Sequence, residues 1–147
     1  MSGDGENIPI HSMPGFLIRR FHQLHDTIWE KELNGWITAP QFGVLSTLAV
    51  RPGIHQQNLC SLVALDSSTA ADIVNRLVRA GLIRKRRDPA DRRRSLLELT
   101  PAGERVVETA TPLVHEVNRR LTGALSEADV ALLGDLIGRV LDARPRR

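Results

Sequence analysis

The sequence predicts a mainly α-helical protein that carries one small β-hairpin. Apolar residues recur at helical spacing through most of the 147 residues. In one segment, which follows a dense basic cluster, apolar and polar residues alternate instead, as in a strand. This basic cluster, residues 84–94, holds seven Arg or Lys and two Asp, although the whole chain has a formal net charge of only +3. A turn signal at Asp88 and the apolar run Leu96, Leu97, Leu99 predict two short strands joined by a cationic tip.

The N-terminal part is expected to contain an arm and two helices. Residues 1–13 combine Gly, Asp, Asn and Pro with little apolar periodicity, which is typical of an arm that is mobile or held by a partner. The second of the two helices begins after Thr38, because Thr38 and Gln41 have the spacing of a capping box. Before it, a helix is predicted over about residues 14–33, with an apolar stripe of Leu17, Phe21, Leu24 and Ile28.

Two further helices precede the hairpin. A short one is predicted over residues 55–63 and a second over about residues 67–80. The second is bounded by Asp66, whose carboxylate can accept from free backbone N–H groups, and by Gly81, which tolerates a left-handed conformation. One of its faces is apolar and the other is polar. This layout is that of a helix-turn-helix, and the basic hairpin that follows makes the motif winged.

The last part of the chain is expected to form two long amphipathic helices. Thr100 can cap a helix that starts at Pro101, where the missing N–H has no cost. Its apolar positions continue past Pro112, so a kink is expected there. Ser126 starts the final helix. Together with the N-terminal helix, these exceed what a small winged helix needs to cover its core, which favours burial against a second copy of the chain.

Length and composition restrict the class of protein. The length fits one domain, residues 1–147, and the isoelectric point of about 10 suggests an anionic partner. No stretch approaches the roughly 20 apolar residues that span a bilayer, and the N-terminus lacks the layout of a secretory signal, so we expect a cytoplasmic protein without a membrane partner. Common catalytic motifs are absent, so neither an enzyme nor a cofactor is expected. Cys60, the one cysteine, cannot form an internal disulfide and is expected to be a buried thiol.

The most specific segment is DPADRRRSLLELTPAGE, residues 88–104. Its order, D-x-x-D-R-R, an apolar strand and L-T-x-x-G after a helix-turn-helix, resembles the multiple-antibiotic-resistance regulator (MarR) family of bacterial winged-helix transcription factors. The resemblance covers roughly residues 14–143. It implies a homodimer, joined through helices in residues 14–36 and 101–143, that presents a winged helix of residues 38–100 to a pseudo-palindromic operator. It also implies release from DNA, usually of a repressor, when a small molecule binds.

Polar and basic side chains of the second motif helix and of the wing are the candidates for contact with double-stranded operator DNA. Hydroxyls at a helix start usually bind phosphate and set the register, whereas side chains deeper in the groove read bases. For Arg92 and Arg94 a solvated tip is the alternative role. The candidates are Ser67, Ser68, Thr69, Asp72, Asn75, Arg76, Asp91, Arg92, Arg93 and Arg94.

Two of these candidates take their roles from the resemblance. The family commonly places a minor-groove arginine two residues after the wing aspartate, which implies that role for Arg93 and an orienting bond from Asp91. Asp72 stands where several relatives carry a long basic or polar reader. Its carboxylate can accept from a cytosine amino group, and the equal alternative is that it pairs with Arg76 or Arg79.

The N-terminal helix carries a second cluster of functional side chains. The segment FLIRRFHQLHDTIWEKEL places His22, His25 and Trp29 on one face, next to Arg19, and Trp36 is a candidate wall of the same site. Two imidazoles, an indole and a guanidinium can hold a flat aromatic acid. The helix is also similar to that of MarR members that control the breakdown of aromatic acids or their coenzyme A thioesters, which implies such an effector. The alternatives are a dimer-facing surface with hydrogen-bonded histidines and a core position for Trp36.

Other kinds of regulator remain as alternatives. A MarR-type protein can respond to an oxidant or a metal instead, but relatives that sense oxidants place their cysteine in the first helix, unlike Cys60. No metal site is expected, because His22 and His25 lack an obvious nearby Cys or acidic partner. The alternative is that His115 or Glu116 approaches them in three dimensions. A winged-helix module for protein contacts, without an effector, would have an apolar or acidic recognition face and would not need a cationic wing.

Overall fold

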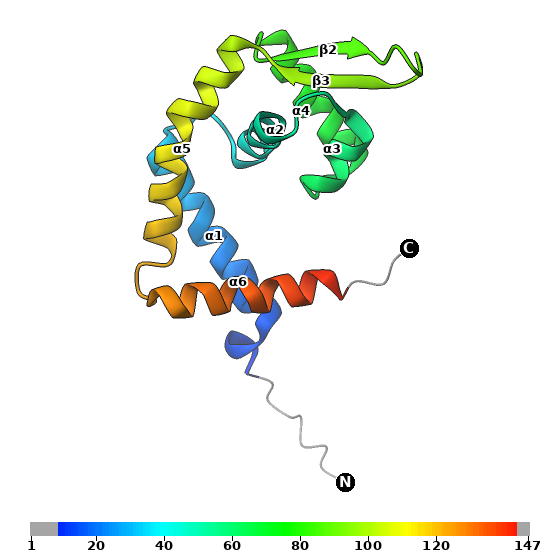
Figure 1. Ribbon diagram of the computed structural model, residues 1–147. Coiled ribbons are helices and arrows are strands. Elements are labelled where there is room, and N and C mark those ends of the chain that lie inside the picture. Colours follow the sequence, from blue (N-terminus) through cyan, green and yellow to red (C-terminus); the bar gives the residue numbers. More distant parts are fainter. Residues whose placement is uncertain (1–8, 144–147) are drawn as a thin grey trace. The chain divides into compact units, whose positions relative to one another are not determined.

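The computed structural model describes residues 9–143 (Figure 1). It confirms the predicted class, a mainly helical winged helix-turn-helix with a small sheet. The part of the expected arm formed by residues 1–8 lies outside the described residues. The elements in chain order are η1 (Ile10–Ser12), α1 (Pro14–Leu33), α2 (Ala39–Val50), β1 (Ile54–His55), α3 (Gln56–Leu62), α4 (Ser67–Arg79), β2 (Ile83–Arg87), β3 (Ser95–Leu99), α5 (Pro101–Leu121) and α6 (Glu127–Asp142).

The chain divides into two compact units, which are described separately. The winged unit comprises residues 29–115, and the terminal unit comprises, of the described residues, 9–28 and 116–143. The last turn of α1 and most of α5 therefore belong to the winged unit. The resemblance implied a division of the single domain into helices of residues 14–36 and 101–143 and a winged helix of residues 38–100, whereas these two units divide within α1 and within α5.

The winged unit contains a three-stranded antiparallel sheet in the order β1-β3-β2. The predicted hairpin is its β2–β3 pair, in which Ile83 lies opposite Leu99. The sequence analysis missed β1, which pairs Ile54 with Leu97 on the other edge of β3. A strand of two residues has no periodicity to detect, so only its pairing identifies it. This pairing connects the wing to the segment that precedes α3.

Helices α2, α3 and α4 pack with the sheet around the core of the winged unit. Aliphatic side chains fill this core, as the scarcity of aromatic residues requires. Cys60 on α3 is half-buried, so the expected buried thiol is only partly correct. The fully buried side chains include Val44, Leu45, Leu48, Leu59, Ala70, Val74 and Leu97.

Helix caps lie where the sequence predicts them. Thr38 Oγ1 accepts from the N–H of Gln41 at 3.2 Å, and Gln41 Oε1 accepts from the N–H of Thr38 at 3.0 Å, which forms the capping box of α2. Ser126 Oγ accepts from the N–H of Asp129 at 3.2 Å and starts α6. Helix α5 continues through Pro112, as the apolar pattern indicated. The capping bonds join residues that are close in sequence, so the caps can be predicted from one sequence alone.

The L-T-x-x-G segment fixes the start of α5 to the end of α4. Thr100 Oγ1 donates to the carbonyl of Gly81 at 2.6 Å and accepts from the N–H of Gly103 at 3.1 Å, while the Thr100 N–H donates to the carbonyl of Leu82 at 3.0 Å. A Cβ at position 103 would collide with the Leu82 carbonyl, so glycine is required for this close approach. The end of β3 and the start of α5 are thereby held to the turn that follows α4.

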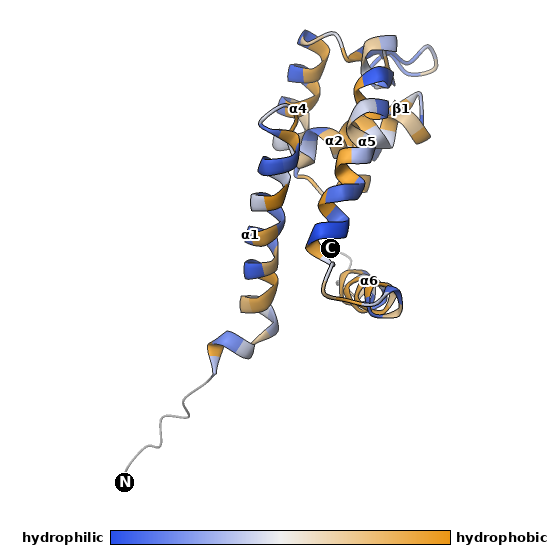
Figure 2. Ribbon diagram, turned by 90° about the vertical axis from the view of Figure 1, so that its left-hand side faces the viewer, coloured by the Kyte–Doolittle hydropathy of each residue, from blue (hydrophilic) through white to orange (hydrophobic). Residues whose placement is uncertain are grey.

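The terminal unit exposes a large apolar surface. No residue of α6 is buried, and apolar residues are distributed along both α1 and α6 (Figure 2). The two helices line a groove of about 490 Å³, with Phe21 and Leu24 from α1 and Leu133 and Ile137 from α6. Among the described residues, no helix has both the length and the apolar character needed to cross a membrane.

Candidate nucleic-acid interface

Asp66 organises the start of α4, the recognition helix. Its Oδ1 accepts from the N–H of Thr69 at 2.8 Å and the hydroxyl of Ser68 at 2.7 Å, and its Oδ2 accepts from the hydroxyl of Thr69 at 2.8 Å. The backbone bond from Thr69 and then these hydroxyl bonds lower the pKa of Asp66 from 3.8 to about 2. A phosphate oxygen only accepts, so it must compete with Asp66 for both hydroxyl hydrogens. Ser67, also at the helix start, is exposed and makes no such bond among the described residues.

The outward face of α4 is polar and exposed. Asp72, Asn75, Arg76 and Arg79 all lie on the surface. Within residues 9–143 no ion pair joins Asp72 to Arg76 or to Arg79, so the alternative of a paired Asp72 is not realised in this structure. These side chains are therefore available to base edges and phosphates.

The Glu98 carboxylate forms ion pairs with two of the wing arginines and so balances part of their positive charge. Arg84 Nη2 donates to Glu98 Oε2 at 2.8 Å, and Arg86 Nη2 donates to Glu98 Oε1 at 3.0 Å. The bond from Arg84 and then that from Arg86 lower the pKa of Glu98. Lys85 and Arg87 alternate with them along β2 and form no ion pair with any described residue. Strand β2 therefore has one compensated face and one face with unpaired positive charge.

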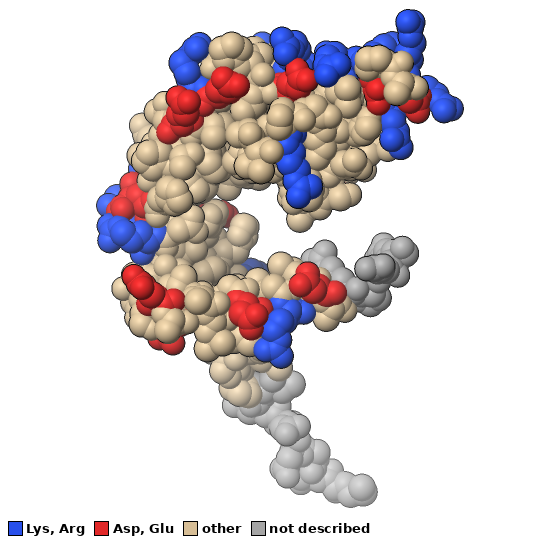
Figure 3. Space-filling view, in the orientation of Figure 1, with Lys and Arg blue, Asp and Glu red and all other residues tan. Residues whose placement is uncertain are grey.

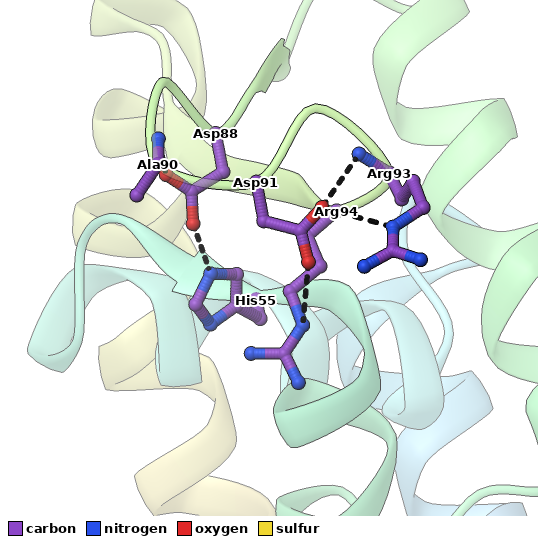
Figure 4. A network of polar contacts seen from close by, with 6 residues as sticks. All are labelled: His55, Asp88, Ala90, Asp91, Arg93 and Arg94. Carbon is purple, nitrogen blue, oxygen red and sulfur yellow. Dashed lines mark hydrogen bonds and ion pairs between the residues drawn. The ribbon is translucent and has the colours of Figure 1, made fainter.

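Asp91 shapes the loop between β2 and β3 (Figure 4). Its Oδ1 accepts from the N–H of Arg93 at 3.1 Å and from Arg93 Nε at 3.3 Å, and its Oδ2 lies 4.0 Å from Arg94 Nε. The Arg93 side chain is still 91% exposed, so Asp91 restrains one edge of the guanidinium and leaves the rest open to solvent. This contact is the one that the family resemblance implied. Arg92 is exposed and has no ion pair within residues 9–143.

Asp88 ties the wing to the helix-turn-helix (Figure 4). His55 Nε2 donates to Asp88 Oδ2 at 2.7 Å, and the N–H of Ala90 donates to Asp88 Oδ1 at 2.8 Å. The His55 and Asp88 side chains are only 26% and 14% exposed, respectively. The bond from His55, followed by that from Ala90, lowers the pKa of Asp88. The sequence analysis missed this pair, because its members are 33 residues apart and only the pairing of β1 with β3 brings them together.

A small groove of about 190 Å³ adjoins this pair. Imidazole, amide and guanidinium groups line it and no carboxylate does, so it presents hydrogen-bond donors to an anion. Figure 3 shows basic side chains gathered over the wing. Such an arrangement suits the phosphodiester backbone of a nucleic acid. The lining residues are His55, Gln56, Gln57, Arg93, Arg94 and Ser95.

The terminal unit holds three of the predicted effector residues. Arg19, His22 and His25 lie on α1, and the two imidazoles are stacked with ring centres 6.2 Å apart and planes 7° from parallel. Asp26 lies beside both rings: its Oδ2 is 3.4 Å from His22 Nε2, and its Oδ1 is 3.2 Å from His25 Nδ1. The expectation that these histidines lack an acidic partner is therefore wrong. The spacing H-x-x-H-D was the signal that could have revealed it.

The two predicted effector tryptophans lie in the winged unit. Trp29 is 8% exposed, its Nε1 donates to the carbonyl of Ile37 at 2.8 Å, and its ring packs against Phe42 at a centre distance of 6.1 Å. Trp36 is 46% exposed, so the alternative of a core position for it is wrong. Trp29 is thus a core residue, whereas Trp36 presents its ring to solvent.

Comparison with known proteins identifies the family. Residues 37–95 match the model of the MarR family. The chain is similar to the transcriptional regulator HosA of Escherichia coli O111:H-, with 32% identity over 126 residues that cover 86% of this chain and 93% of HosA.

Solved structures of two regulators are similar to this chain over nearly its whole length. One is PcaV of Streptomyces coelicolor in complex with its natural ligand, at 40% identity and a TM-score of 0.88, with 92% of this chain and 96% of PcaV covered. The other is BpsR of Bordetella bronchiseptica, whose DNA binding is regulated by 6-hydroxynicotinic acid. It shows 30% identity and a TM-score of 0.88, with 91% of this chain and 96% of BpsR covered.

Proposed function

This chain belongs to the MarR family of transcriptional regulators, and we propose that it is a repressor that binds a pseudo-palindromic operator as a homodimer and is released by a small aromatic acid or its coenzyme A thioester. The observation that carries the proposal comes from the winged unit. An exposed polar face on α4 accompanies a wing in which Asp91 restrains Arg93 while the guanidinium stays open to solvent. The family and the relatives are regulators of transcription, which are not enzymes.

Direct contacts divide between the two grooves of DNA. The start of α4, with Ser67, Ser68 and Thr69, meets phosphate, and Asn75 and Arg76 further along the helix read base edges in the major groove. In the wing, Arg93 enters the minor groove with Asp91 as its restraint, and a narrow A·T-rich groove attracts it most strongly. Asp72, Arg92 and Arg94 flank these contacts.

The exposed apolar faces of the terminal unit support the homodimer. Helices α1 and α6 leave large apolar side chains in solvent, such as Ile18 at 61% and Leu132 at 54% exposed, and contiguous apolar surface of this kind usually marks a protein interface. A twofold dimer places two recognition helices about 34–36 Å apart, which matches two half-sites one helical turn apart on the operator.

The effector proposal rests on α1 and on the relatives. Arg19 can bind a carboxylate through two parallel hydrogen bonds, and the His22 and His25 rings present aromatic surface. The regulation of BpsR by 6-hydroxynicotinic acid supports an aromatic acid as the class of effector. The acid releases DNA only if it binds more tightly to a dimer whose recognition helices do not fit the operator, because a ligand shifts an equilibrium only by its difference in affinity.

Replacing Arg93 with alanine tests the DNA-binding site. Arg93→Ala is expected to weaken operator binding and, if its guanidinium neutralises phosphate charge at the edges of the minor groove, to flatten the log–log dependence of affinity on salt by about one unit per lost contact, hence by about two units for the dimer. Electrophoretic shift or fluorescence anisotropy against promoter DNA at several salt concentrations measures both quantities. Arg139→Ala on α6 removes the same charge outside the winged unit and should leave the slope unchanged. An Arg93→Ala protein with the affinity and slope of the wild type would remove Arg93 from the interface.

Calorimetric titration tests the effector. Benzoates, cinnamates, nicotinates and their thioesters are titrated into the wild type, and the acid that binds is expected to lower operator affinity and, reciprocally, to bind more weakly when DNA is present. Arg19→Ala and His22→Ala should each reduce its affinity. The neighbouring Arg20→Ala is the matched control. Binding that survives Arg19→Ala but disappears in Arg20→Ala would move the carboxylate site, and a panel without any binder would leave the histidine face as a dimer surface.

A further inference from the structure

We propose that His22, His25 and Asp26 on α1 form a binding site for a divalent transition-metal ion, with Zn²⁺ as the preferred biological ion. Their ligand atoms all lie within 4.8 Å of one another. In residues 9–143, no other group of three or more His, Cys, Asp or Glu side chains brings its ligand atoms as close together. The proposal does not depend on an aromatic effector, although both involve the two histidines.

The spacing along the helix explains why the three side chains converge. Residues three and four positions apart lie on the same face of a helix, so His25 and Asp26 both stand one turn from His22. The two carboxylate oxygens of Asp26 each approach a different imidazole, at 3.4 Å from His22 Nε2 and 3.2 Å from His25 Nδ1. One rigid helical turn therefore presents all three donors, and no loop has to be ordered when an ion binds.

These separations suit a small metal ion. In a tetrahedral Zn²⁺ site with bonds of about 2.0–2.1 Å, neighbouring ligand atoms are about 3.3 Å apart. The distances from the two imidazoles to the Asp26 carboxylate are close to that value, and no two of the three ligand atoms are more than 4.8 Å apart. Rotation about the side-chain bonds of His22, His25 and Asp26 is the movement that would bring the three ligand atoms to equal distances from one ion.

The donor set selects the class of ion. Two imidazole nitrogens and one carboxylate oxygen suit Zn²⁺, Ni²⁺ or Cu²⁺, whereas Mg²⁺ and Ca²⁺ prefer a shell made of oxygen alone. Three protein ligands leave a fourth tetrahedral position for water or for an anionic group. The His22 and Asp26 side chains are 72% and 60% exposed and that of His25 is 25% exposed, so an ion reaches the site from solvent without any opening of the fold.

Titration of the full-length, tag-free protein tests the proposal after metals have been stripped with a chelator. Isothermal calorimetry should detect one Zn²⁺ per chain and no binding of Mg²⁺. Asp26→Asn and His22→Ala should each weaken Zn²⁺ binding by more than the roughly tenfold that loss of an outer-shell partner costs. The matched controls are His115→Ala on α5 and Asp135→Asn on α6, which remove the same kinds of group outside the cluster and should leave the affinity unchanged.

Two further variants separate this proposal from that of an aromatic effector. Arg19→Ala removes a neighbouring positive charge, so it should not weaken Zn²⁺ binding, while it should reduce binding of the acid. Asp26→Asn should weaken Zn²⁺ binding and leave the carboxylate-binding arginine in place. Absence of Zn²⁺ binding, or an affinity that is the same in the wild type, Asp26→Asn and His22→Ala, would overturn the metal site without bearing on the effector.

Discussion

Replacing Trp29 with alanine is expected to lower the free energy of unfolding by about 3–5 kcal/mol, the usual cost of truncating a large buried aromatic side chain. The indole is 8% exposed, packs against Phe42 and donates to the carbonyl of Ile37 at 2.8 Å. Truncation would leave a cavity and also deprive that carbonyl of its donor. A loss of this size is a large part of the stability of an ordinary domain.

Trp36→Ala is the matched control, because it removes the same side chain from an exposed position seven residues later. Its effect should stay within about 0.5 kcal/mol. Urea unfolding followed by circular dichroism, at one protein concentration for all samples, measures both changes, since a dimer makes stability depend on concentration. Equal midpoints for the two variants would contradict the assignment of Trp29 to the core.

This expectation changes how the effector site should be tested. If Trp29→Ala abolishes acid binding, loss of folded protein explains the result as well as loss of a contact does. Arg19→Ala and His22→Ala alter exposed side chains and are free of this ambiguity. Trp29→Phe retains most of the buried volume and is the suitable conservative change at this position.

Local signals in the sequence predicted the elements of the fold. The sequence predicts caps at Thr38, Asp66 and Ser126 from their residue types and positions before a helical pattern. In the structure each of them accepts from the backbone N–H three residues later. The hairpin followed from the turn at Asp88 and from the apolar residues of β3. None of these signals requires knowledge of what packs against the element, and all of them were correct.

The parts of the site that the sequence did not predict depend on contacts between distant segments or on the partner of a helix face. His55 gives no sign of its contact with Asp88 until β1 pairs with β3. Helical spacing put Trp29 on a stripe with His22 and His25, but spacing does not tell which part of a stripe packs into a core. Asp26 differs from these cases, because it follows His25 directly and stands four residues after His22, a spacing that places it beside both imidazoles on the helix.

Breaking the contact between His55 and Asp88 is expected to weaken operator binding by about tenfold, the effect of losing one charge-assisted hydrogen bond that positions the wing. The contact is 2.7 Å long, and it joins the residue before α3 to the first residue of the wing loop. Without it, the loop that carries Arg93 and Arg94 keeps only its own turn contacts. The loop would then have to become ordered when DNA binds, and the entropy lost in this ordering lowers the affinity.

A double-mutant cycle separates positioning from direct contact. Asp88→Ala and the double variant should have similar operator affinities, because Asp88→Ala already breaks the contact with His55 and the loss of His55 then has nothing further to remove. His55→Ala alone should bind no more weakly than these two, because Asp88 keeps its bond from the N–H of Ala90. Their salt dependence should match that of the wild type if neither residue neutralises phosphate, in contrast to Arg93→Ala. His115→Ala serves as the histidine control outside the wing. His55 also lines the groove beside Arg93 and Arg94. If His55→Ala alone flattened the salt dependence, and if the losses of operator affinity in the two single variants added up in the double variant, His55 would be a phosphate contact. That result would contradict its role as the anchor of the wing.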